Sequence, residues 1–170
     1  MAKKKKLWFS EGDNVVYPGY GVGTVHGFEE LNLGGTVRSF CVLLVNEGGN
    51  ESRVRIPLDN VDEVRLRKLS TKKEVQKAMQ YLDDGDPEVP GTWRGRFAAH
   101  GELLSEGSLE SVAHVLKALH VLDKKSPLSF REKKMYQKAL QLFATEAGKT
   151  LDKPKEEVEE TIIKVLEKTQ

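Results

Sequence analysis

The stretch VRLRKLSTKKEVQKAM, residues 64–79, contains the point at which the pattern of the whole chain changes. In its first six residues apolar and basic side chains alternate, as expected for a half-exposed β-strand. Thr71 and Glu74 then have the spacing of a helix-capping box, and an apolar stripe of helical period follows them. The sequence therefore predicts two domains, residues 1–69 built from strands and residues 70–170 built from helices.

Short β-prone segments, separated by Gly, Asn and Pro turns, fill the first of these domains. A small sheet of this kind closes best by curling into a barrel, because closure reduces its exposed strand edges. We therefore predict an α+β protein that begins with a small five-stranded β-barrel. The expected strands are residues 15–17, 22–31, 37–45, 53–57 and 64–69.

The second domain is predicted to be a compact all-α bundle of about five helices. Ser108 and Ser129 are suitable N-cap residues, Ser129 and Glu132 have the spacing of a second capping box, and Pro154 is placed as a first-turn proline. The helices are expected to begin after Thr71, near Trp93, after Ser108, after Ser129 and at Pro154.

Composition indicates a globular chain of 170 residues with 38% apolar and 31% charged side chains and a net charge of +1. No apolar run approaches the roughly 18 residues of a membrane helix. The basic run Lys3 to Lys6 leads into no apolar segment of a signal peptide, so we expect a cytoplasmic protein without an export signal. The single cysteine, Cys41, lies in an apolar run and is expected to be buried.

Signals for an enzyme are poor. The four histidines do not cluster, and no cysteine or carboxylate motif has metal-ligand spacing, so we expect no catalytic, metal or cofactor site. The glycines of residues 19–23 lack the Gly-Lys-Ser/Thr of a phosphate-binding loop and are better explained as a turn.

Two basic groups in the helical half suggest a surface for nucleic acid. The first surrounds Trp93, with Arg94 and Arg96 beside it. The second, residues 124–138, holds six Lys or Arg and one acidic residue. Its alternative interpretation is the solvated face of an amphipathic helix, because the bundle as a whole carries as many acidic as basic side chains.

Trp93 itself allows two interpretations. It precedes Phe97 by four positions and could share an inward face with it. It also begins a helix, where its ring could project beside cations and stack on a base or wedge into a groove.

Several motifs in this order resemble the CarD/CdnL family of bacterial transcription regulators, over about residues 9–166. They are GDNVVYPGYGVG at 12–23, RVRIP at 53–57, VRLRKL at 64–69, WRGRFAAH at 93–100, VAHVLKAL at 112–119 and PLSFREKKMYQKA at 127–139.

The resemblance implies a Tudor-like, SH3-like barrel that binds the β subunit of RNA polymerase, followed by a helical domain that binds promoter DNA at the upstream edge of the melted bubble. A tryptophan wedge there would stabilise the open complex, in a nucleoid-associated protein that we expect to be a monomer. Carried over, the DNA-contacting residues are Trp93, Arg94, Arg96, Lys133, Lys134 and Lys138, and the polymerase-contacting residues are Leu31, Leu33, Arg55 and Pro57.

The sequence also departs from the family. Leu31 stands where some relatives carry a basic residue, and Gly95 and Ala98 stand where relatives often carry positive charge. The alternative function is a Tudor-like or KOW-like module of another nucleoprotein complex such as the ribosome, which would leave the basic helical half unexplained.

Overall fold

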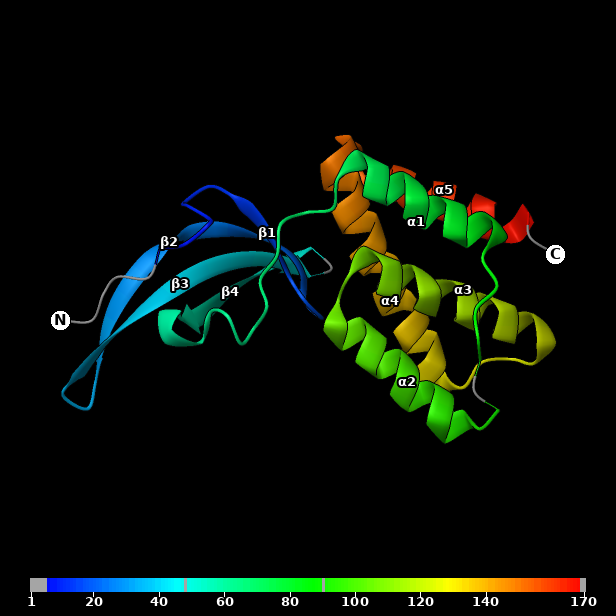
Figure 1. The fold of residues 1–170 in the computed structure, drawn as a ribbon, viewed down its shortest axis with the longest axis horizontal. Coiled ribbons are helices and arrows are strands. Elements are labelled where there is room, and N and C mark those ends of the chain that lie inside the picture. Colours follow the sequence, from blue (N-terminus) through cyan, green and yellow to red (C-terminus); the bar gives the residue numbers. More distant parts are fainter. Residues whose placement is uncertain (1–5, 48, 90, 169–170) are drawn as a thin grey trace. The chain divides into compact units, whose positions relative to one another are not determined.

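The structure, a computed structural model, describes residues 6–47, 49–89 and 91–168. The chain divides into two compact units, Met1–Lys68 and Leu69–Gln170. The first contains an antiparallel sheet and the second contains helices, as Figure 1 shows. The predicted α+β layout is therefore confirmed.

The sheet is a meander in which each strand pairs with the next along the chain. It consists of β1 (Asn14–Tyr17), β2 (Gly21–Leu33), β3 (Thr36–Glu47) and β4 (Asn50–Pro57), in the order β1-β2-β3-β4. The β2–β3 hairpin turns at Gly34 and Gly35, whose φ angles of 63° and 89° suit glycine because it lacks a Cβ. The side chain of Asn32 closes this turn by accepting a hydrogen bond from the Gly35 amide at 2.9 Å.

The sheet curls, but its predicted closure by a fifth strand is not confirmed. A register shift between Val25 and Gly27 bends the β2–β3 pair, and the curvature is visible in Figure 1. Residues 64–69 form no strand and contribute one β-bridge, between Val16 and Arg67. The reason is local, because Arg65 has a φ of 55° and interrupts the extended backbone. In the described ranges the sheet is thus a four-stranded half-barrel.

One face of the sheet holds the apolar core of this unit, which includes Cys41, Leu43 and Ile56. A short 3-10 helix, η1 (Leu58–Asn60), follows β4, and the chain beyond it closes the core with Val61 and other apolar residues. Cys41 is fully buried, as predicted, and its burial raises the pKa of the thiol to about 11. A thiol of this kind stays protonated and unreactive at neutral pH.

Five helices form the second unit: α1 (Lys72–Asp84), α2 (Trp93–Glu106), α3 (Leu109–Lys125), α4 (Phe130–Leu151) and α5 (Lys155–Lys168). Thr71 and Glu74 form the complete capping box that the sequence predicts. Ser108 and Ser129 cap α3 and α4, also as predicted. Pro154 lies one residue before α5, slightly ahead of its expected first-turn position.

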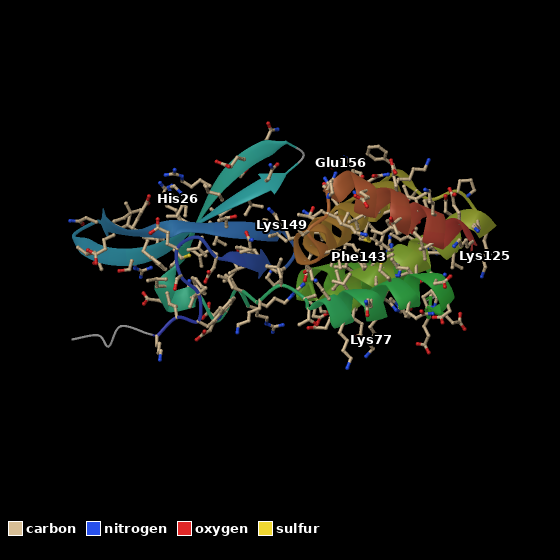
Figure 2. The ribbon with its side chains drawn as sticks, turned by 90° about the horizontal axis from the view of Figure 1, so that it is seen from above. His26, Lys77, Lys125, Phe143, Lys149 and Glu156 are labelled. Carbon is tan, nitrogen blue, oxygen red and sulfur yellow. The ribbon has the colours of Figure 1, made fainter. Side chains whose placement is uncertain are left out.

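The core of the helical unit lies around α3, which packs against α1, α2 and α4, while α5 packs against α1 and α4. Phe143 lies inside the bundle, whereas Lys77 and Lys125 extend from its surface, as Figure 2 shows. In the part of the chain that the structure describes, no helix is long and apolar enough to span a membrane.

Lys117 is an unexpected member of this core because its side chain is only 2% exposed. Its ammonium group donates hydrogen bonds to the carbonyl oxygens of Leu82 and Asp83, at 2.7 and 3.1 Å. These carbonyls lie in the last turn of α1, where carbonyl groups lack partners within the helix. Lys117 therefore caps α1 from α3, and its burial lowers the pKa of its ammonium group.

Candidate nucleic-acid and polymerase interfaces

Trp93 is the first residue of α2 and lies outside the buried core. Thr92 caps the helix by accepting a hydrogen bond from the Gly95 amide. The indole ring is 37% exposed and stacks on Phe97, with ring centroids 5.3 Å apart and an interplanar angle of 13°. Its Nε1 donates a hydrogen bond to the hydroxyl of Ser129, the N-cap of α4, at 3.3 Å. The ring is thus held at one edge and one face while a large part of it meets solvent.

A buried ion pair fastens the same two helix ends to each other. Arg96 Nε lies 2.9 Å from Glu132 Oε1, and the side chains are 21% and 2% exposed. Glu132 thereby takes part in only half of the predicted capping box at α4. Its amide donates to Ser129, while its carboxylate pairs with Arg96 on α2. We call Trp93, Arg96, Ser129 and Glu132 the α2–α4 corner.

The predicted basic residues divide between the corner and two sides of α4. Arg94 is exposed next to Trp93. Lys134 and Lys138 are exposed and one helical turn apart, so they share a face of α4. Lys133 lies elsewhere, since it lines a shallow cavity of about 350 Å³ together with residues of α3 and α5. Arg96 is paired with the buried carboxylate of Glu132.

His100 lies one turn beyond Arg96 and is 1% exposed. Neither of its ring nitrogens has a hydrogen-bond partner among the described residues. Burial lowers the pKa of this imidazole, with further lowering from His114 on α3 and Arg96 on α2, against an opposing effect of Glu132 on α4. The ring is therefore held neutral beneath the α2–α4 corner.

The helical unit is expected to lose stability in mild acid because of His100. The unfolded chain takes up a proton near pH 6.5, whereas the folded chain resists it to lower pH, so the free energy of unfolding falls as the pH drops below 6.5. The slope is at most about 1.4 kcal/mol per pH unit for one group. His100→Gln should reduce this dependence in urea denaturation at pH 7.5 and 5.5, and the part contributed by His120, whose pKa is also lowered by burial, should remain. His26→Gln, at an exposed site on the sheet, is the matched control, and equal slopes for all three proteins would contradict the assignment.

The four predicted polymerase-contacting residues share one face of the sheet. Leu31 pairs with Arg38 and Leu33 with Thr36 across β2 and β3. Across β3 and β4, Phe40 pairs with Pro57 and Val42 pairs with Arg55. Paired residues share a face and alternate residues along a strand return to it, so all four residues lie opposite the apolar core. We call this side, defined by Leu31, Leu33, Arg55 and Pro57, the Arg55 face.

Glu29 partly balances the charge of the Arg55 face. Its carboxylate lies 2.9 Å from Arg55 Nε and 3.8 Å from Arg53 on the same face. The hydrogen bond from Arg55 is the main reason that the pKa of Glu29 is lowered. Arg55 remains 46% exposed. The alternating pattern of β4 gave no sign that Glu29 pairs with Arg55, because the register of the strands decides which side chains meet across the sheet.

The described residues contain no group of three or more His, Cys, Asp or Glu side chains that could hold a metal ion.

Comparisons with known proteins agree with this two-part organisation. Residues 9–70 match the family described as "CarD-like/TRCF RID domain", and residues 77–163 match "CarD, C-terminal domain". The Bacillus subtilis (strain 168) protein named "Putative transcription factor YdeB" is 23% identical over 138 residues, which cover 81% of this chain and 89% of that protein. The solved structure "CdnLNt from Myxoccoccus xanthus" is 42% identical, covers 39% of this chain and 92% of its own, and has a TM-score of 0.31.

The two family matches follow each other along the chain, and the second alone spans half of it. The chain therefore belongs to the CarD/CdnL family of transcription regulators that interact with RNA polymerase.

Proposed function

We propose that this protein binds the β subunit of bacterial RNA polymerase through an N-terminal domain of residues 1–69. Its helical domain, residues 70–170, contacts promoter DNA at the upstream edge of the bubble, where Trp93 acts as a wedge. The protein acts as a monomer, without catalytic activity, and stabilises the open complex. In this proposal its site of action is the cytoplasmic nucleoid.

The observation that carries the proposal is the position of Trp93. An aromatic ring at a helix end, with its Nε1 hydrogen-bonded, one face stacked on Phe97 and 37% of its surface exposed, can enter a widened groove. Arg94 beside it and Lys134 and Lys138 on α4 are exposed cations suited to backbone phosphates.

Arg96 has a supporting role in this proposal. Its pairing with the buried Glu132 keeps α2 against α4, and so keeps the indole at the surface in a fixed orientation. A residue that orients the wedge in this way contributes to DNA binding even though its own charge is paired with a carboxylate within the protein.

The energetics require only modest DNA affinity. A protein that binds the open form better than the closed form shifts the equilibrium by its differential affinity. One stacked aromatic is worth about 1–3 kcal/mol, which corresponds to about 5- to 150-fold in the ratio of open to closed complexes. Docking through the Arg55 face would raise the local concentration of the helical domain near the bubble.

Co-purification with RNA polymerase followed by footprinting of a promoter complex tests the proposal. The full chain should co-purify with the polymerase, and it should extend protection of the DNA at the upstream edge of the bubble. It should also lengthen the lifetime of the open complex. Co-purification with ribosomes in place of polymerase would favour the alternative of a module in another nucleoprotein complex.

A further inference from the structure

Phe130 is the most exposed large apolar side chain of the described residues, at 72%. It is the first residue of α4, and the buried side of that helix, which includes Ala139 and Phe143, turns away from it. The ring therefore contributes nothing to the core. Lys134, one turn later, places its ammonium group 4.7 Å from the ring centroid, which leaves the other face of the ring open to a ligand.

Phe130 is also next to the α2–α4 corner. It directly follows Ser129, whose hydroxyl accepts the hydrogen bond from Trp93. Two exposed aromatic side chains, Trp93 and Phe130, therefore belong to the first turns of α2 and α4, whose ends are joined by this hydrogen bond.

Several exposed cations and one exposed acid lie near Phe130 in the sequence. Residues 124–138 hold six basic side chains, all exposed, and one acid, Glu132, while Asp123, just before this range, accepts a hydrogen bond from the Leu128 amide. Glu132 is only 2% exposed and paired with Arg96, so it offers little negative charge to solvent. An open aromatic ring with the ammonium group of Lys134 against it and exposed Arg131 next to it in sequence matches a ligand that combines a flat apolar surface with negative charge.

We propose that Phe130 is a second nucleic-acid contact, on whose ring an unpaired base stacks. The inference rests on the proposed function and extends it, because paired bases inside a duplex present no free face while bases at a melted junction do. Trp93 would then keep the junction open and Phe130 would bind a base released by it.

Fluorescence anisotropy of the full chain with labelled DNA at low salt tests this inference. Three probes are compared, namely a single strand, the matched duplex, and the same duplex with a central mismatched bubble. Phe130→Ala is expected to weaken binding of the bubble and the single strand by about five-fold, the lower end for one stacked base, and to leave duplex binding unchanged. Phe130→Tyr should retain binding, whereas Phe130→Leu should fail, because it keeps apolar bulk without a ring face.

The control variant is Ile163→Ala, which removes another exposed apolar side chain, on α5, and should bind like the unaltered protein. Full binding by Phe130→Leu, or an equal loss on all three probes, would overturn base stacking. A loss with Trp93→Ala but none with Phe130→Ala would overturn this inference and leave the proposed function standing.

Absence of DNA binding by the unaltered protein would overturn both the stacking inference and the proposed DNA role. Normal binding by Phe130→Ala to DNA, combined with loss of polymerase co-purification, would instead assign Phe130 to a protein contact.

Discussion

Trp93→Ala is expected to shorten the lifetime of the open promoter complex by about 5- to 150-fold relative to the unaltered protein, if the ring contributes the free energy of one stacked aromatic. The loss should appear in the rate at which the bubble recloses, because the ring binds only the open form. The measurement is the decay of competitor-resistant complexes on a linear promoter fragment, with polymerase saturated by each variant.

The fold should tolerate this change, because the indole is 37% exposed and belongs to no buried cluster. The variant loses one stacking contact with Phe97 and one hydrogen bond to Ser129, so α2 should keep its place. Trp8→Ala is the matched control, since Trp8 is 47% exposed and lies in the other unit. Unfolding of Trp93→Ala would mean that the ring serves the core, and an unchanged lifetime in a folded variant would end the wedge proposal.

Features that depend on neighbours in sequence were predictable. The capping box of Thr71 and Glu74 and the N-caps at Ser108 and Ser129 lie where the sequence places them, because each needs only residues three positions apart. The burial of Cys41 likewise follows from the apolar run that contains it.

Features that depend on partners distant in sequence were not predictable. Ser129 and Glu132 read as an ordinary capping box, and nothing local indicates that Arg96, 36 residues earlier, binds the same carboxylate. Lys117 interrupts an apolar face, and its sequence context indicates a solvent-exposed side chain. Its burial depends on two carbonyl groups of α1, to which it donates hydrogen bonds. In both cases the partner becomes visible only when the helices have packed.

The fifth strand shows the limit of periodicity. Residues 64–69 alternate as a strand should, yet Arg65 takes a left-handed backbone conformation and the segment contributes a single bridge at Arg67. Arginine has no strong preference for that conformation, so the sequence carries no warning of it. Leu66 of this segment nevertheless belongs to the apolar core of the sheet.

Arg55→Glu is expected to abolish co-purification with RNA polymerase while sparing weak binding to DNA. Arg55 is about half exposed on the Arg55 face, so the substitution reverses a charge that a partner would meet. It also places a carboxylate near Glu29, which removes the pairing that now holds the side chain in position. Reversed charge at an interface costs several kcal/mol through repulsion of the complementary group.

Two further variants separate docking from a local disturbance of the sheet. Arg53→Glu is the matched control, because Arg53 lies two residues away on the same face, is 48% exposed and also approaches Glu29, yet the resemblance assigns it no contact. Arg55→Met removes the charge without adding a carboxylate and should weaken co-purification less than Arg55→Glu. Val42 and Ile56 stay buried next to this position. The free energy of unfolding of all three variants should therefore match that of the unaltered protein. Retained co-purification by a folded Arg55→Glu would show that polymerase docks elsewhere. An equal loss of co-purification with Arg53→Glu would show that polymerase responds only to the overall charge of this face.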